Sequence, residues 1–259
     1  MPPLFDFIFP KRHPSVFFFT LHKSASTLFG NVVLPNISNL KHVDFASQIY
    51  SGELKSKPVF EKQGFIYGPI RVWQEPDNPE SQLLLEPVLE TDFLRRIKCL
   101  LFIRDPRDVL VSFYFSVAAT HGVSDVPEIA RLQEQRRSEA LELGIDAFCV
   151  QTAPKILENY STIRRIQSLG KEKIMLRYED MIEDFSTFSA NLRTFVPVED
   201  KVMERLFHDS RPLERENTSH HKRSGAIGSF HNKLQPQTIE KINHQLQDVL
   251  VHFRYLTLP

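Results

Sequence analysis

Two strongly apolar runs stand out along the chain, the unbroken run Val16–Phe19 and the run 97–103, in which Lys98 is the single charged residue. Neither run alternates apolar with polar residues, which is typical of parallel strands that are covered on both faces. Weaker patterns predict further strands at 40–45, 63–72 and 173–178. Apolar residues at helical spacing predict helices between and after them, at 27–33, 83–96, 109–120, 145–169, 185–195 and 238–256.

This alternation of strands and helices predicts the α/β class, with a central parallel β-sheet and helices on both faces in a three-layer sandwich. The length of 259 residues fits a single domain over 1–259, with an N-terminal extension at 1–14. Several local features are also predicted. The polar segment 46–58 is expected on the surface, Gly68-Pro69 should force a bend or an edge strand, Pro154 should break a helix, and 123–143 is either an exposed helix or a lid.

Composition and charge narrow the class of protein. The chain is 41% apolar, and 32 basic residues balance 32 acidic ones, which disfavours a nucleic-acid partner although a local basic pocket stays open. Cys99 and Cys149 lie in apolar surroundings and are expected to be reduced core residues. The adjacent pair His220-His221 lacks the spacing of zinc ligands, so no metal site is predicted.

The N-terminus and the length of the apolar runs bear on where the protein is expected in the cell. The N-terminus has no basic leader before an uninterrupted apolar core, so it does not resemble a signal peptide. No apolar run reaches 18 residues, the length that a membrane-spanning helix needs. We therefore expect a soluble, cytoplasmic enzyme without a transmembrane segment.

The stretch 16–31 predicts an anion site. A buried strand leads into Lys23-Ser24-Ala25-Ser26-Thr27 and then into an apolar segment able to start a helix. The first N–H groups of a helix lack internal partners, and the helix dipole attracts negative charge. The alternative is an ordinary strand-to-helix junction with a capping serine. No GxxxxGK[ST] motif occurs in the chain, which disfavours the rival hypothesis of a nucleoside-phosphate kinase.

Three predicted strands end in polar sequences that suit phosphate: HKSAST at 22–27, RDPRD at 104–108 and RYED at 177–180. Ligands of parallel sheets bind beyond the carboxyl ends of the strands. A loop with arginine and glycine, KRSGAIGSF at 222–230, follows near the C-terminus. These segments together favour a phosphate-binding site more strongly than any one of them.

The four segments resemble, in order and spacing, the motifs of the sulfotransferase family that uses 3′-phosphoadenosine 5′-phosphosulfate (PAPS). The first is similar to P-K-S-G-T-T, with His22 in place of proline and Ala25 in place of glycine. Residues 103–116 resemble the 3′-phosphate signature, and 176–181 the Y-E-D segment. The segment 222–230 resembles R-K-G-x-x-G-D-W, with Ser224 replacing lysine and Ser229-Phe230 replacing Asp-Trp.

The resemblance implies a P-loop-like sulfotransferase fold and transfer of a sulfuryl group from PAPS to a hydroxyl or amine, with release of 3′-phosphoadenosine 5′-phosphate (PAP) and without a metal. The acceptor would be a small molecule or a hydroxyl of a glycan or lipid. A dimer is one option for the oligomeric state, and a catalytically degenerate homologue that only binds nucleotide is the non-enzymatic alternative. The residues implied in cofactor binding are Lys23, Ser24, Ala25, Ser26, Thr27, Leu28, Arg104, Ser112, Tyr178, Arg223, Ser224 and Gly225.

Catalysis needs charge stabilisation and a base. Lys23 is the candidate for stabilising the leaving group, because an ammonium on a flexible stem can follow the developing charge. Asp44 and His42, two apart on a predicted strand, are the candidate general bases, and His121 is a third. An exposed pair at a strand end is the simpler interpretation of the first two. Several aromatic residues either line an acceptor pocket or belong to the core: Tyr50, Tyr67, Trp73, Phe113, Tyr114 and Phe115.

Overall fold

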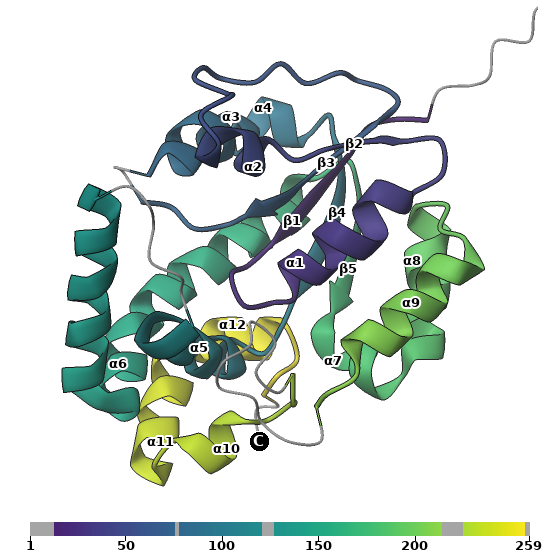
Figure 1. Ribbon diagram of the computed structural model, residues 1–259. Coiled ribbons are helices and arrows are strands. Elements are labelled where there is room, and N and C mark those ends of the chain that lie inside the picture. Colours follow the sequence, from purple (N-terminus) through teal and green to yellow (C-terminus); the bar gives the residue numbers. More distant parts are fainter. Residues whose placement is uncertain (1–12, 76–77, 121–126, 214–224, 257–259) are drawn as a thin grey trace, which may run out of the picture.

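The computed structural model describes residues 13–75, 78–120, 127–213 and 225–256 (Figure 1). At its centre is a five-stranded sheet with the order β2-β3-β1-β4-β5, and all four strand pairings are parallel. The predicted α/β fold with a central parallel sheet is confirmed. The strands are β1 Val16–Thr20, β2 Lys41–Val43, β3 Phe65–Arg71, β4 Lys98–Ile103 and β5 Glu172–Arg177.

Strand β1 lies in the middle of the sheet and is buried along its whole length. Side chains alternate across a strand, so Phe17 and Phe19 enter the core on one face, while Val16 and Phe18 enter the core on the other. Phe18 stacks on Phe29 with ring centroids 5.1 Å apart. The apolar run therefore reflects two cores, one on each side of the same strand.

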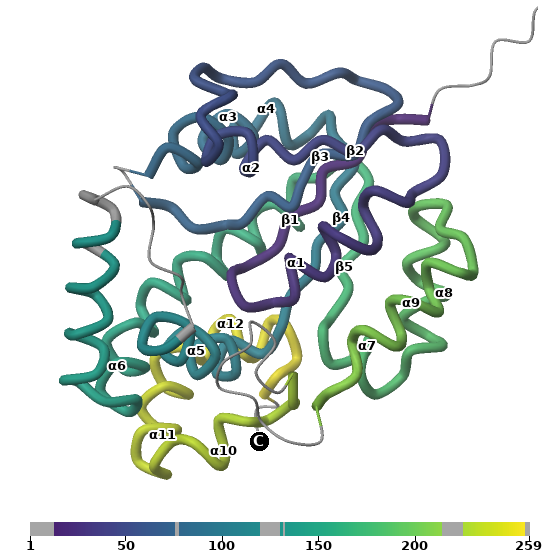
Figure 2. The backbone as a smooth tube through the Cα atoms, viewed as in Figure 1, coloured from purple at the N-terminus to yellow at the C-terminus, as the bar shows by residue number. Residues whose placement is uncertain are grey.

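Helices cover both faces and complete the three layers (Figures 1 and 2). One face carries α1 Ser26–Leu28, which continues as η1 Phe29–Val33 and η2 Leu34–Asn36, together with α7 Tyr178–Glu183, α8 Phe185–Phe195 and α9 Asp200–Ser210. The other face carries α2 Phe45–Tyr50, η3 Ser81–Leu85, α3 Glu86–Val88, α4 Thr91–Leu94, α5 Pro106–Phe115, η4 Ser116–Thr120, α6 Pro127–Leu169, α10 Phe230–Lys233, α11 Pro236–Gln245 and α12 Gln247–His252.

The polar segment 46–58 lies mostly on the surface, as predicted, and only Ala46 and Ile49 are buried. Its first part forms helix α2, which Asp44 caps by accepting a hydrogen bond from the Ser47 N–H. Of the two alternatives predicted for Gly68-Pro69, a bend or an edge strand, the edge is excluded because β3 lies between β2 and β1. The sheet accommodates the pair through a register shift between Phe17 and Phe19 of the neighbouring strand.

Two helix predictions also need correction. The expected helix at 83–96 is divided into η3, α3 and α4, because Pro87 falls inside the segment and Glu90 adopts an extended backbone. The break in the long helix α6 lies at Gly144, whose φ is 68°, whereas Pro154 remains inside the helix. Glycine reaches this left-handed conformation without the steric penalty of a Cβ atom.

Cys99 and Cys149 are buried and unpaired, as predicted. Burial raises the pKa of each thiol to about 12, so neither is a reactive thiolate at neutral pH.

Among the described helices, none combines the length and the apolar character needed to cross a membrane. Residues 13–15 already pair with the chain beside β3, through bonds such as Ser15 N–H to Lys62 O at 2.9 Å.

Gly68 gives a test of how closely β3 and β1 approach. A Cβ atom at this position would lie 2.8 Å from the Phe18 carbonyl oxygen, and the φ of Gly68 is 143°. We expect Gly68→Ala to lower the free energy of unfolding by about 1–3 kcal/mol more than a control. The control is Gly52→Ala, which also has a positive φ but has no atom within 4 Å of the added Cβ. Urea unfolding of both variants measures the difference, and equal losses would contradict the predicted clash.

Candidate functional site

The loop between β1 and α1 has the backbone of an anion cradle. Lys23 and Ala25, on either side of Ser24, have positive φ values of 65° and 58°. Alternation of this kind turns successive backbone N–H groups toward one side, a geometry that binds anions. Helix α1 begins directly afterwards and continues to Asn36 through η1 and η2. The loop thus combines oriented N–H groups with the positive end of a helix.

Two polar atoms beside this loop are buried and lack a hydrogen-bond partner among the described residues. They are Ser24 Oγ, on a side chain with 0% exposure, and Arg104 Nε. Buried polar groups in folded proteins are almost always hydrogen-bonded, so an unpaired hydroxyl and guanidinium N–H at one place indicate a site made for a ligand. Their donor chemistry fits phosphate or sulfate oxygens.

Lys23 lies at the entrance of the loop. Its Nζ donates to Ser116 Oγ over 3.1 Å, which fixes the ammonium against the start of η4. The resemblance implies Ser112 instead, which lies one helical turn earlier in α5 and forms no hydrogen bond with the loop in the described part of the chain. Ser116 was missed, although the i, i+4 spacing from Ser112 places both on one side of the helical segment.

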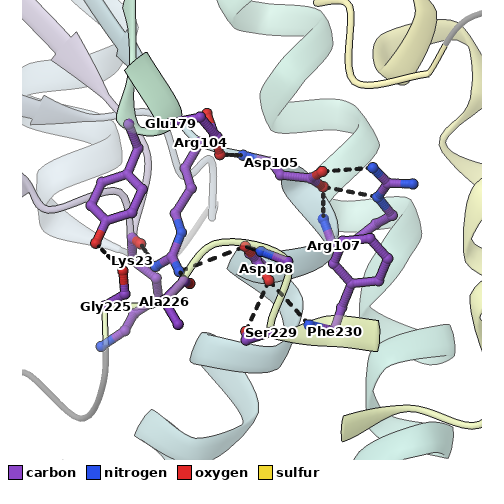
Figure 3. A network of polar contacts seen from close by, with 12 residues as sticks. Lys23, Arg104, Asp105, Arg107, Asp108, Glu179, Gly225, Ala226, Ser229 and Phe230 are labelled. Atoms are coloured by element: carbon purple, nitrogen blue, oxygen red, sulfur yellow. Dashed lines mark hydrogen bonds and ion pairs between the residues drawn. The ribbon is translucent and has the colours of Figure 1, made fainter. Parts of the chain in front are cut away.

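Arg104, the first residue after β4, connects the loop to the C-terminal part of the chain (Figure 3). Its guanidinium donates to the Lys23 carbonyl at 3.2 Å and to the Ala226 carbonyl at 2.8 Å. It also lies over the ring of Tyr178, 4.4 Å from the ring centre. Tyr178 in turn donates from its hydroxyl to the Gly225 carbonyl at 2.6 Å. One buried arginine therefore holds both segments that the sequence assigns to phosphate.

Asp108 anchors the C-terminal loop from the other side. Its carboxylate, with 0% exposure, accepts hydrogen bonds from Gly228 N–H, Ser229 Oγ and Phe230 N–H at 2.8, 2.8 and 3.1 Å. One oxygen also lies 3.8 Å from Arg104. No role was predicted for Asp108, although an acid four residues after Arg104 is expected to face it where the chain is helical.

A second layer of polar residues supports these side chains. Asp105 accepts a bidentate ion pair from Arg107, with a closest distance of 2.6 Å, and its N–H donates to Glu179 at 2.8 Å. Tyr255 donates to the other Glu179 oxygen, and Tyr160 donates to the Arg104 carbonyl. Burial raises the pKa of the Glu179 carboxyl and of both tyrosine hydroxyls. These residues hold the ends of β4 and β5 in place.

The candidate bases lie elsewhere. His42 pairs in register with Ile66, near the start of β3, and its Nε2 lies 2.7 Å from the Gly68 carbonyl oxygen. Asp44 uses Oδ1 to cap α2. His121, Arg223 and Ser224 fall outside the described residues. Within the described residues, the hydrogen bonds of His42 and Asp44 go to Gly68 and Ser47 and not to the loop at 22–27, so their assignment as bases stays a prediction.

The aromatic candidates divide into two groups. Tyr67 belongs to the core, where it is 2% exposed and its hydroxyl accepts from the Glu61 N–H. Trp73 lies against His22 and Phe113, with ring centroids 5.4 and 5.0 Å away, and is therefore beside the loop. Within the described part of the chain, no group of His, Cys, Asp and Glu side chains is placed to hold a metal ion.

Comparison with known proteins agrees with this geometry. The family model described as the sulfotransferase domain matches residues 14–253. No curated protein sequence matches the chain. A mouse sulfotransferase, SULT7A1, complexed with PAP has a similar structure, with a TM-score of 0.55, 14% identity, and coverage of 92% of this chain and 84% of that one.

Two structures of retinol dehydratase are also similar. The complex with androsterone and the inactive cofactor PAP has a TM-score of 0.55 and 13% identity, and it covers 93% of this chain and 82% of that one. The complex with retinol and PAP has a TM-score of 0.53 and 14% identity, with coverage of 96% and 84%. At this identity, the similarity establishes the fold.

Asp108 gives the test of the polar site. We expect Asp108→Asn to lower the free energy of unfolding by about 3 kcal/mol. The amide leaves Arg104 without a buried counter-charge, and its NH₂ group would face the N–H donors of the C-terminal loop that the carboxylate accepts from. The matched control is Asp180→Asn at an exposed position of α7. Denaturant unfolding of both variants measures the effect. A loss no larger than that of the control would show that Asp108 does not hold the loop.

Proposed function

The chain belongs to the sulfotransferase domain family, and on that premise we propose that it transfers the sulfuryl group of PAPS to a hydroxyl group of an acceptor molecule. The observation that carries the proposal is Arg104. Its guanidinium contacts the Lys23 carbonyl of the first loop and the Ala226 carbonyl of the last loop at the same time. A nucleotide with a phosphate at each end of its ribose needs two anion sites held at a fixed separation, which this arrangement supports.

The donor would lie across the carboxyl ends of β4 and β1. The N–H groups of the loop at 24–28 and the Ser24 hydroxyl would hold its 5′ end, and the helix dipole of α1 favours the negative charge there. Arg104, Ser112 and the segment 223–225 would hold its 3′-phosphate. The unpaired Nε of Arg104 is a donor of the type that such a phosphate accepts from. Tyr178 would take the adenine side of this site, and its contacts with Arg104 and Gly225 fix it there.

The donor supplies an activated sulfuryl group and a phosphate as leaving group. The protein has to position the reactants and stabilise charge on the oxygen that leaves, as in phosphoryl transfer. Lys23 would provide this stabilisation. Its backbone is held by Arg104 and its ammonium by Ser116, so the charge is placed before the reaction begins.

The acceptor side would be apolar in part. His22, which precedes Lys23 in the chain, packs against Trp73, and Trp73 packs against Phe113, so that the three rings form one aromatic group. Similar structures hold retinol and androsterone, which are apolar alcohols. We therefore propose a hydroxylated molecule with an apolar body as the class of acceptor, and a metal-independent reaction.

Donor recognition is tested by thermal stabilisation. We expect PAP to raise the melting temperature more than adenosine 5′-phosphate, ATP or GTP at equal concentration, because only PAP fills both anion sites. Saturation at about 100 times the dissociation constant corresponds to about 2.7 kcal/mol of added stability. An equal shift by PAP and adenosine 5′-phosphate would contradict the 3′-phosphate site, and a preference for ATP would favour a kinase.

Lys23 is tested by separating binding from chemistry. We expect Lys23→Ala to lower kcat by about 10²–10³-fold, because it removes the charge that stabilises the leaving group. The thermal shift by PAP should remain, since backbone N–H groups of the loop are unchanged. Lys41→Ala, at an exposed position of β2, is the control and should keep the wild-type rate. Loss of PAP binding together with activity would assign Lys23 to donor binding instead.

A further inference from the structure

A buried carboxylate lies at the carboxyl end of β3, outside every motif discussed above. Glu80 is 6% exposed although it belongs to the connection that follows β3. Its backbone position is fixed, because the Glu80 N–H donates to Asn78 Oδ1 at 2.8 Å and the hydroxyl of the next residue, Ser81, donates to the Trp73 carbonyl at 2.9 Å. A charged side chain is rarely buried in a connection unless it has a partner or a function.

The two oxygens of this carboxylate differ. Oε2 accepts a hydrogen bond from the Tyr50 hydroxyl at 3.0 Å. Oε1 is buried and has no hydrogen-bond partner among the described residues. A rigidly held carboxylate with one oxygen left unpaired is equipped to accept a proton from a bound molecule.

Arg71 connects Glu80 to the phosphate loop. It is the last residue of β3, and its Nε donates to Ser26 Oγ at 3.2 Å. Glu80 lies near the end of β3, because the hydroxyl of the next residue, Ser81, donates to the carbonyl of Trp73, two residues after Arg71. The charge of Arg71 and its N–H lower the pKa of the Glu80 carboxyl. Arg71 is in register with Thr20, the residue that ends β1.

The order of the strands determines how the residues at their carboxyl ends are arranged relative to the donor. Arg104 and Tyr178 follow β4 and β5, the phosphate loop follows β1, and Glu80 lies at β3 on the far side of β1. A donor that extends from β4 to β1 presents its sulfuryl end toward β3. In-line displacement requires the acceptor to approach opposite the leaving oxygen. The acceptor hydroxyl therefore arrives on the side where Glu80 lies.

By the same geometry, His42 is less suitable than Glu80 to accept the proton of the acceptor hydroxyl. It is in register with Ile66, which precedes Arg71 by five residues, or about 16 Å along the strand. Asp44, whose negative charge raises the pKa of the Glu80 carboxyl, uses its own carboxylate to cap α2.

We propose that Glu80 is the general base of the sulfuryl transfer, an inference that rests on the proposed function. In the step, the acceptor oxygen forms a bond to sulfur as the bond between sulfur and the bridging phosphate oxygen breaks. The electron pair of that bond leaves with PAP. The proton of the acceptor hydroxyl moves to Glu80 Oε1 and is released to solvent after the product departs.

The surroundings of Glu80 determine its pH dependence. Burial raises the pKa of its carboxyl most strongly, and the negative charge of Asp44 raises it further. Arg71, by its charge and its N–H, and the hydrogen bond from Tyr50 lower it. The net effect is a raised pKa, which strengthens the carboxylate as a base. The rate should therefore fall on the acid side at a higher pH than for an ordinary glutamate.

The central experiment compares two acceptors, benzyl alcohol and 4-nitrophenol, with PAPS as donor. Benzyl alcohol needs a base, whereas 4-nitrophenol is already largely ionised near neutral pH. We expect Glu80→Gln to lower kcat with benzyl alcohol by about 10²–10⁴-fold and to change kcat with 4-nitrophenol much less. Equal losses with both acceptors, or no loss with either, would overturn the role of Glu80 as a base.

Three further variants separate the candidates. Glu90→Gln, an exposed carboxylate in the same connection, should keep the wild-type rate. Tyr50→Phe should move the acid limb of the rate profile to higher pH, because it removes a bond that lowers the pKa of Glu80. Asp44→Asn should move the limb to lower pH, because it removes a charge that raises this pKa. A large loss of kcat in Asp44→Asn, with Glu80→Gln unaffected, would assign the base to Asp44 instead.

Stability gives a readout that is independent of turnover. Because the folded-state pKa of Glu80 is raised, the ionised side chain destabilises the native state, and this cost appears as pH rises through the unfolded value of about 4.3 toward the folded value. Glu80→Gln keeps an acceptor for Tyr50 and removes the charge. Its melting temperature should exceed that of the wild type by roughly 2–4 °C near neutral pH, and the difference should vanish in acid. A difference that does not depend on pH would contradict a buried ionised Glu80.

Failure of the inference is distinguishable from failure of the proposed function. If the wild type shows neither a preferential shift with PAP nor transfer of labelled sulfate to either acceptor or to water, the proposed function fails and Glu80 loses its role with it. If the wild type transfers sulfate and Glu80→Gln equals it with benzyl alcohol, only the inference fails.

Discussion

The burial of the Arg104 guanidinium is the constraint on which the site depends. A cation that is 7% exposed must find its partners within the protein, and Arg104 finds them in the first loop, the ring of Tyr178, the Ala226 carbonyl and Asp108. These partners come from distant parts of the chain. Satisfying one charge therefore brings together the ends of β1, β4 and β5 and the loop before α10. The Nε remains unpaired among the described residues and so keeps a donor that the proposed 3′-phosphate would use.

The fold was largely predictable because its signals are local. The runs at 16–19 and 97–103 record burial on two faces, and a strand of that kind has few alternatives in an α/β protein. The first loop and Arg104 were also predictable, since strand ends in parallel sheets are where ligands bind. The helix at 83–96 was not, because its turns depend on packing around Pro87 and Glu90, which apolar spacing does not encode.

The acceptor side could not be predicted for a physical reason. Glu80 matches no motif and lies in a polar stretch, QEPDNPES, that composition alone assigns to a loop. Its role depends on contacts with Tyr50 and Arg71, which precede it by 30 and 9 positions and come from different elements. The periodicity of a strand identified His42 and Asp44 as neighbours, but it did not specify at which end of the sheet each side chain would lie. Register with β3 supplies that information.

Donor and acceptor sides also differ in how their buried charges are satisfied. On the donor side, carboxylates such as Asp108 and Asp105 are fully engaged by N–H groups and arginines, which fixes the geometry of two loops. On the acceptor side, Glu80 keeps one oxygen unpaired among the described residues. A fully bonded carboxylate is a poor base, and a loosely held one cannot direct a proton transfer. The hydrogen bond from Tyr50 to Oε2 orients the carboxylate and leaves Oε1 with capacity to accept a proton, at a cost in stability that the remainder of the fold must offset.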